Sequence, residues 1–360
     1  MPSWLEIMLG LVVILAVFYD LFESVILPRP AVRKIALVRR LLRAFWWMWR
    51  WIGNRMESQS RRESWLAVFA PLGVLSMFGV WALALILGYG LLIDGVRTEV
   101  HPVPQTFGTS LYFSATTLVP LSYGDFVPEG VPARLITIAE SASGVVLAAL
   151  VITLLFSLYE SFQRREELVV QLDAFAGAPP NGMQILETAA QRGMHEQLIR
   201  TFEEWRAWAA AVLESHLAYP MLFWFRSSHD NEAWLNSFGA VMDAAVLVLS
   251  TVDDDSDGAA RLMFTVGNHL VEDLSWFFRY EKVADPIVEK YEYDQARERL
   301  RAAGFHCRDM KAAWEKFAHL RSNYASQLNQ LARNLSIVPA EWIGDRSYLP
   351  HRNRPGRRLR

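Results

Sequence analysis

Residues 106–125 read TFGTSLYFSATTLVPLSYGD, and this stretch decides how the rest of the chain is interpreted. Residues 106–118 are apolar and rich in hydroxyl groups, but a helix that crosses a bilayer needs about 20 residues. A turn follows at residues 123–125, and the chain then becomes apolar again. A half-length helix that enters and returns is tolerated only where protein or water covers its backbone. The stretch is therefore predicted to be either a re-entrant membrane element or an ordinary extracellular loop.

Long apolar segments lie on both sides of this stretch. Residues 7–27, 65–93 and 141–159 are each long and apolar enough to cross a membrane, and residues 65–93 contain no charged side chain. Residues 237–250 are too short and contain Asp243, so we expect a buried helix of a soluble domain there. The sequence predicts three membrane-spanning helices.

The charges are distributed unevenly along the 360 residues, although the net charge is only −2. Residues 1–165 carry 14 Lys and Arg against 11 Asp and Glu, residues 166–345 carry 16 against 27, and residues 346–360 add six Arg. Ten basic residues lie between positions 28 and 62, and basic loops stay in the cytoplasm. We therefore expect a multi-pass protein of the bacterial inner membrane, with its N-terminus outside and its C-terminal half in the cytoplasm. No basic residue precedes the first apolar segment, so we expect that segment to remain attached.

Basic and tryptophan side chains are mixed between residues 31 and 62. This composition is typical of a helix that lies in the lipid headgroup layer. The alternative is a voltage sensor, since Arg40 and Arg43 are three residues apart. A sensor needs a longer arginine ladder inside a spanning helix, so the interfacial helix is the favoured interpretation.

The sequence YFSATTL at residues 112–118, followed by YGD at residues 123–125, resembles the pore helix and selectivity filter of the bacterial potassium-channel pore-loop family. The resemblance covers residues 65–160. It implies a re-entrant pore helix and filter between the second and third predicted spans. Taken with the three apolar segments and the helical pattern of the C-terminal half, we expect an all-α membrane protein with three transmembrane helices, a re-entrant pore helix and filter, and a helical cytoplasmic domain. The expected organisation is an N-terminal transmembrane helix (1–30), a basic interfacial helix (31–62), a pore domain (63–165, with outer helix 64–94, pore helix 106–118, filter 119–125 and inner helix 131–160), a helical cytoplasmic domain (166–345) and a basic tail (346–360).

In that family the filter reads TVGYG, and four copies supply backbone carbonyls that replace the hydration shell of the ion. The matching residues here are Pro120, Leu121, Ser122, Tyr123 and Gly124. Pro120 lacks the hydroxyl of the family's threonine. Ser122 replaces a glycine with left-handed geometry, which costs another residue about 1–2 kcal/mol. The resemblance implies a homotetrameric pore for potassium or for cations in general, with the permeant ion in place of a cofactor or fixed metal.

Four residues near the filter have candidate roles. Thr116 and Thr117 would support the filter from the pore helix. Asp125 would form a ring of carboxylates at the outer mouth or cap the filter turn locally. Gly144 is either a gating hinge or a site of close helix packing.

Three acidic residues in the expected membrane helices need partners. For Glu140 we expect either an ion pair with Arg134 or a hydrogen bond behind the filter, because an acid inside a membrane is otherwise a candidate for function. For Asp20 and Glu23, which share one helix face near the cytoplasmic headgroups, we expect pairs with Arg29 or Arg33 rather than a role in carrying protons.

Residues 162 onward have the periodicity of helices, and the Gly- and Pro-containing stretch at residues 177–182 is predicted to mark a boundary. Seven of the 14 Trp residues follow it, enough for a sizeable core. There is no Gly-rich dinucleotide fingerprint. Residues 253–258 resemble half of a calcium loop, but Phe264 stands where the bidentate Glu belongs. A solvated turn is therefore the better interpretation.

The sequence shows no nucleophile–base arrangement, and its single cysteine, Cys307, excludes a disulfide framework. His216, His229 and His269 are expected to be packed or exposed singly. We therefore predict a non-enzymatic channel in contact with lipid and without nucleic acid, gated through a cytoplasmic domain of unknown ligand. The alternatives are a non-conducting membrane-anchored sensor or scaffold, and a membrane enzyme that works through the cytoplasmic domain.

Overall fold

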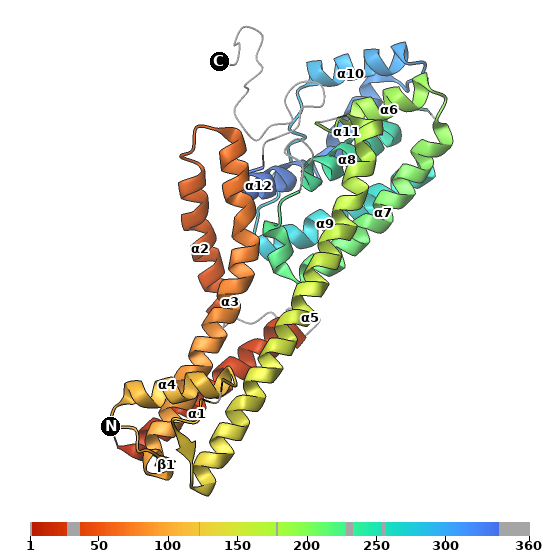
Figure 1. Cartoon of the computed structure of the whole chain (residues 1–360). Coiled ribbons are helices and arrows are strands. Elements are labelled where there is room, and N and C mark those ends of the chain that lie inside the picture. Colours follow the sequence, from red (N-terminus) through yellow and green to blue (C-terminus); the bar gives the residue numbers. More distant parts are fainter. Residues whose placement is uncertain are drawn as a thin grey trace. The chain divides into compact units, whose positions relative to one another are not determined.

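The computed structural model describes residues 2–26, 37–121, 123–177, 179–227, 233–253 and 257–337, and most of these are helical (Figure 1). The basic tail at residues 346–360 lies outside the described residues. In chain order the elements are α1 (Ser3–Leu21), the π-helix η1 (Phe22–Ile26), α2 (Leu37–Gly53), α3 (Gln59–Gly95), the 3-10 helix η2 (Arg97–Glu99), β1 (Val100–His101), α4 (Phe107–Leu118), β2 (Val127–Pro128), α5 (Val131–Ala176), α6 (Gly182–Gln191), α7 (His195–Ala218), the 3-10 helix η3 (Pro220–Trp224), α8 (Trp234–Ser250), α9 (Asp257–Phe278), α10 (Lys290–Ala302), α11 (Met310–Arg321) and α12 (Ala325–Leu335).

Three helical segments of the described chain are long and apolar enough to cross a membrane, namely Ser3–Ser24, Arg61–Gly95 and Val131–Ala176. The predicted all-α membrane architecture with three spans is therefore confirmed. The last of these helices extends well beyond the expected end of the inner helix at residue 160. Residues 161–176 contain neither Gly nor Pro, and the helix ends at Gly177, whose φ of +77° is in the left-handed conformation.

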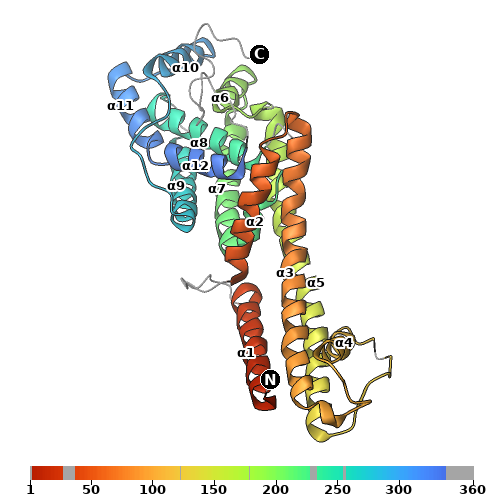
Figure 2. The same cartoon turned by 90° about the vertical axis from the view of Figure 1, so that its left-hand side faces the viewer.

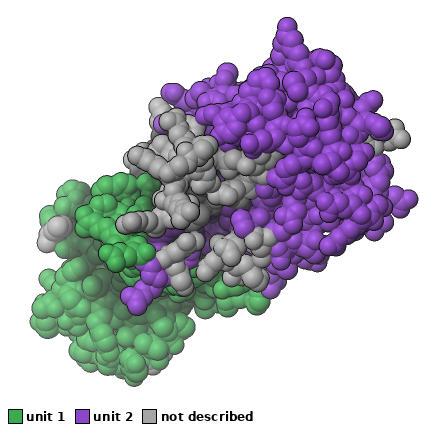
Figure 3. All heavy atoms as spheres, turned by 90° about the horizontal axis from the view of Figure 1, so that it is seen from above, with its two compact units in different colours: residues 1–57, 64–160 green, residues 58–63, 161–360 purple. Residues whose placement is uncertain are grey.

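The chain divides into two compact units, coloured separately in Figure 3. The first contains residues 1–57 and 64–160, and the second contains residues 58–63 and 161–360. The division in α5 thus falls at residue 160. The boundary expected at residues 177–182 is a turn between α5 and α6 inside the second unit, where the Asn181 side chain accepts a hydrogen bond from the Met183 N–H at 2.8 Å.

Within the first unit, α1 packs antiparallel against α3 through small residues. A β-carbon on Gly10 would lie 2.6 Å from the carbonyl oxygen of Gly88, so the two backbones are as close as glycine allows. Near the other end of α1, the Trp81 Nε1–H donates to the Asp20 carboxylate at 2.8 Å. Both basic partners expected for Asp20 lie outside the described residues.

The helices α2 and α3 also run antiparallel to one another (Figures 1 and 2). The rings of Trp49 and Trp65 stack with centroids 4.2 Å apart, and each indole N–H donates to the other residue's backbone carbonyl. Trp46 is buried against Phe69, whereas Trp51 is half exposed. A position in the headgroup layer remains a prediction for this tryptophan-rich helix.

The second unit is a helical domain built around α8. Nearly every residue of this helix is buried, which explains why it is apolar on all sides. Its one acid, Asp243, accepts hydrogen bonds from the guanidinium of Arg321 at 3.0 Å and from the Tyr324 hydroxyl at 2.6 Å. The expectation of a buried helix at residues 237–250 is confirmed, whereas the soluble character of its domain remains a prediction.

Candidate functional site

The half-length helix predicted at residues 106–118 is α4, and Thr106 is its N-cap, with a side-chain oxygen that accepts from the Thr109 N–H at 3.3 Å. The connections before and after α4 are joined by the antiparallel pair β1–β2. A small apolar cluster lies beneath this pair and holds it to the flanking helices; it consists of Ile93, Val100, Phe113 and Ala133. The loop is thus tied at both ends to the helices that precede and follow it.

Two serines on one face of α4 attach it to its neighbours. Ser110 donates to Asp94 of α3 at 2.8 Å. One turn later, Ser114 contacts the Ile86 carbonyl of α3 at 2.9 Å and is hydrogen-bonded to Glu140 of α5. The helix is therefore fixed between α3 and α5 by buried polar contacts.

Glu140 is completely buried. Of the two partners expected for it, the hydrogen bond behind the loop is present and the ion pair with Arg134 is wrong. The Arg134 Nε–H instead donates to the Pro128 carbonyl at 3.2 Å, because Arg134 lies at the start of α5 beside β2.

Gly144 allows α5 to approach the end of α4. A β-carbon at this position would lie 2.0 Å from the carbonyl oxygen of Leu118. Three residues earlier, Ser141 donates to the Thr117 carbonyl at 3.1 Å. Of the two roles considered for Gly144, the geometry supports close packing, and α5 continues through it as one helix.

The hydroxyls of Thr116 and Thr117 bond back to the Phe113 carbonyl at 2.9 and 2.8 Å. They are therefore satisfied inside α4. The contact from this part of α4 to the following segment comes from the backbone, since the Thr116 carbonyl accepts the Leu121 N–H at 2.9 Å.

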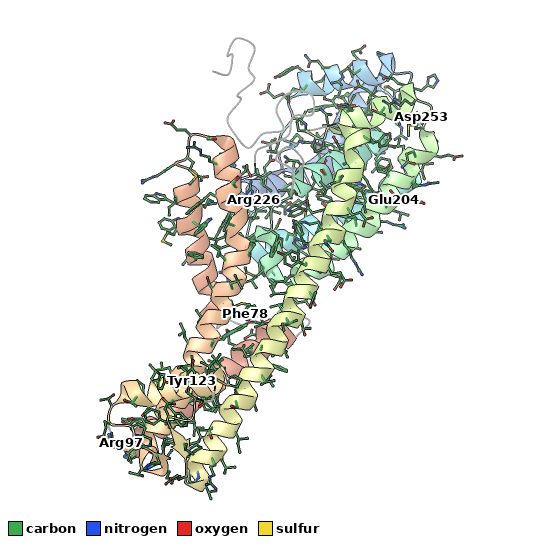
Figure 4. All side chains as sticks on the ribbon, viewed as in Figure 1. Phe78, Arg97, Tyr123, Glu204, Arg226 and Asp253 are labelled. Atoms are coloured by element: carbon green, nitrogen blue, oxygen red, sulfur yellow. The ribbon has the colours of Figure 1, made fainter. Side chains whose placement is uncertain are left out.

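The segment expected to be the filter, residues 119–125, follows directly. Pro120, Leu121, Tyr123, Gly124 and Asp125 are all exposed, and Figure 4 labels Tyr123 beside α4. Gly124 has a φ of +79°, a conformation that glycine adopts without strain. Position 122 lies outside the described residues, so the strain expected there remains a prediction.

Asp125 is hydrogen-bonded to Tyr112 on α4. This bond, followed by slight desolvation and the nearby negative charge, raises the pKa of the exposed Tyr112 hydroxyl above its usual value of 10.0. The local capping role considered for Asp125 therefore has a specific partner. Placing a ring of such carboxylates at a pore mouth remains a prediction.

The electrostatics of this arrangement favour a cation after α4. The last carbonyls of a helix carry a partial negative charge, and those of α4 end beside residues 119–125. In the described part of the chain, no group of three or more His, Cys, Asp or Glu side chains is arranged to hold a fixed metal. Part of the calcium-loop candidate, residues 254–256, lies outside the described residues.

Comparison with protein families supports this geometry. Residues 74–161, which contain most of α3, the whole loop and α5 to just past the unit boundary, match the family model described as "Ion channel". This part of the chain is thus similar to a family of ion-channel domains. Comparison with curated proteins and with solved structures gave no match. The chain is therefore a membrane protein with a pore-loop cation-channel domain, joined to a helical domain that these comparisons do not place in a family.

The channel domain's last helix, α5, is anchored in the second unit by a buried arginine. Arg165 donates to the backbone carbonyls of Leu222 at 3.0 Å and Phe225 at 2.6 Å, and to Glu166 at 2.9 Å. It also contacts His216 Nε2 at 3.2 Å, and the Trp208 indole donates to the Arg165 carbonyl at 2.9 Å. His216 is thus packed, as expected.

A cleft of about 240 Å³ runs along the same stretch of α5. Its floor is apolar and includes Leu172, Phe175 and Trp205, and its rim carries Arg192 and Glu204. A small molecule bound there would touch the helix that continues into the channel domain.

Sequence reasoning missed Ser114, Tyr112 and Arg165. Ser114 was hidden because a serine in a short helix carries no distinctive pattern. Arg165 carried no expectation of its own in the sequence. Its position just past a spanning helix, before an otherwise well-formed helical stretch, is a signal that could have suggested burial.

Proposed function

We propose that four copies of this chain assemble around one pathway for potassium or a related monovalent cation, with residues 119–125 of each copy facing that pathway. Potassium, or another monovalent cation, would be the permeant species and no cofactor would be needed. The observation that carries the proposal is α4, a half-length helix fixed between α3 and α5 whose C-terminal end leads into this exposed segment. One loop gives one side of a ring, so several copies are needed to surround an ion.

The departures from the family's filter bear on selectivity. Pro120 supplies a carbonyl but no hydroxyl for the innermost position, so we expect that site to bind potassium more weakly. Position 122 would need the left-handed backbone that Gly124 already adopts. We favour weak potassium selectivity, with non-selective cation permeation as the second candidate.

We infer the topology from the basic residues. The second unit, with residues 28–62, would lie in the cytoplasm of a bacterial cell, and the loop around α4 would open towards the outside. This arrangement places the C-terminal end of α4 inside the membrane, where its partial charge acts on a partly dehydrated ion.

We infer that the helical domain gates the pore. Two channel-domain helices enter the second unit, since residues 58–63 of α3 and residues 161–176 of α5 belong to it. There, Arg226 bonds both Glu63 of α3 and the Leu335 carbonyl at the end of α12, the latter at 2.7 Å. A ligand or partner that rearranges this domain would therefore move both helices.

Flux of a radioactive potassium isotope into liposomes that contain the purified protein tests the proposal. The matched variant is Gly124→Ala. Nothing lies within 4 Å of the added β-carbon, so the change strains only the backbone of the segment. We expect uptake by the wild type and a large loss in the variant. Absence of uptake by a correctly assembled wild-type tetramer would favour the scaffold alternative.

Mass measurement in mild detergent tests the assembly independently. A tetramer is expected. A monodisperse monomer or dimer would contradict the single-pore arrangement.

The gating proposal is tested by open probability in Glu63→Gln, with Glu57→Gln as control. Both changes remove one negative charge near the start of α3, but Glu57 is exposed whereas Glu63 bonds Arg226. We expect only Glu63→Gln to change the open probability. Equal changes in the two variants would contradict the gating proposal.

A further inference from the structure

Ser114 is the point at which three helices of the channel domain meet. Its hydroxyl oxygen, on α4, lies 2.9 Å from the Ile86 carbonyl of α3 and forms a hydrogen bond with the Oε1 atom of Glu140 on α5. Both Ser114 and Glu140 are fully buried. The number of protons available to these two contacts therefore depends on whether Glu140 is protonated.

A serine hydroxyl has one proton to donate, and a carbonyl can only accept. An ionised Glu140 could also only accept, so the one proton of Ser114 would have to serve two acceptors at once. A protonated Glu140 removes the conflict, because Glu140 donates to Ser114 and Ser114 donates to Ile86. Each contact then has its own proton.

The surroundings of Glu140 also disfavour a charge. No cation of the described chain acts on its carboxyl group, and its Oε2 atom has no hydrogen-bond partner. A buried unpaired carboxylate costs several kcal/mol. The titratable side chain beside it is Tyr89 of α3, and that hydroxyl is bonded to Ser143 at 2.8 Å.

We propose that Glu140 carries a proton at neutral pH and acts, through Ser114, as a positioning residue that holds α4 between α3 and α5. Its effect on conduction rests on the proposed function of residues 119–125, whereas its protonation does not. Loss of the proton at alkaline pH would leave two acceptors facing one hydroxyl and place a negative charge behind α4. The segment after Leu118 would then lose its fixed position.

Infrared difference spectroscopy of the full-length protein in lipid vesicles tests the protonation directly. The wild type minus Glu140→Gln spectrum at neutral pH should contain the carbonyl band of a neutral carboxylic acid. The control is Glu129→Gln, since Glu129 is an exposed acid on the same loop and should contribute no such band. No difference in that band between wild type and Glu140→Gln would overturn the proposal.

Ser114→Ala provides a second variant, in case Glu140→Gln does not fold. After removal of the acceptor hydroxyl, the carboxylic-acid band should still be present but should shift to higher frequency, as expected for an acid that has lost a hydrogen bond. An unshifted band would show that Glu140 does not donate to Ser114.

Cation flux as a function of pH tests the positioning role. The amide of Glu140→Gln can still donate to Ser114, so this variant should conduct at neutral pH and lose a severalfold decline that the wild type shows at alkaline pH. An identical alkaline decline in both proteins would remove the positioning role. A protein that does not conduct at all would refute the proposed function but leave the infrared result interpretable.

Discussion

Gly144 of α5 and Leu118 of α4 approach so closely that a β-carbon on the glycine would lie 2.0 Å from the leucine carbonyl oxygen. Leu118 is the last residue of α4, and the segment proposed to contact the ion begins immediately after it. The position of this segment is therefore set by the backbone of the neighbouring helix. Several consequences can be measured.

Gly144→Ala should displace the end of α4. Overpacking of this kind costs about 1–3 kcal/mol, and more where backbone must move. We expect a lower melting temperature in detergent and a severe loss of cation flux. Gly79→Ala is the control, since Gly79 is also in a channel-domain helix and its added β-carbon would meet nothing within 4 Å. Similar effects of the two substitutions would mean that the contact with Leu118 is unimportant.

Tyr112→Phe should free Asp125 from its hydrogen bond. The raised pKa of Tyr112 means that its neutral, donating form is favoured in the folded protein, so the bond is complete below the ordinary value of 10.0 and is lost only as the pH rises beyond it. At neutral pH the variant should therefore show less stable open currents than the wild type. If single-channel recordings showed no difference between the currents of the variant and the wild type, the hydrogen bond of Asp125 would have no role in holding residues 119–125.

His216 should make the helical domain sensitive to acid. Burial, and then the charge of Arg165, lower the pKa of its imidazole well below 6.5. As the pH falls, the unfolded chain therefore takes up a proton at this histidine before the folded chain does. The contribution of neutral His216 to the free energy of unfolding is complete above about pH 6.5 and declines below it by up to about 1.4 kcal/mol per pH unit. His216→Gln should remove this part of the decline. Thermal unfolding at a series of pH values from neutral to acidic measures this decline. If stability fell with pH as steeply in the variant as in the wild type, His216 would not be the source of the acid sensitivity.

The combined change Pro120→Thr and Ser122→Gly should restore a filter like that of the potassium-channel family. It adds the missing hydroxyl and removes about 1–2 kcal/mol of backbone strain. We expect a higher ratio of potassium to sodium permeability, measured with the two ions on opposite sides of a bilayer. If the ratio stayed the same or fell, these two residues would not be the ones that distinguish this filter.

The length and hydropathy of the helices could be predicted from the sequence because they follow from local composition. Residues 106–118 are too few to cross a membrane, and the segments on both sides of them are long enough to do so. This difference in length was enough to predict the order of elements around α4. The residues that contact one another across helices could not be predicted in the same way. Glu140 had two acceptable partners in sequence, and only packing against α4 selects Ser114 over Arg134. Likewise, periodicity predicts a helix after residue 160, but it does not show that Arg165 is buried against carbonyls more than 50 residues away.

The central claim, that this chain forms a cation-conducting pore, is tested most directly by current through the purified protein in a planar bilayer under a potassium chloride gradient. We predict a current whose reversal potential lies close to the potassium equilibrium potential, because the α4 carbonyls and residues 119–125 favour cations. The absence of current from a protein of correct assembly, or a reversal potential at the chloride equilibrium potential, would contradict the claim.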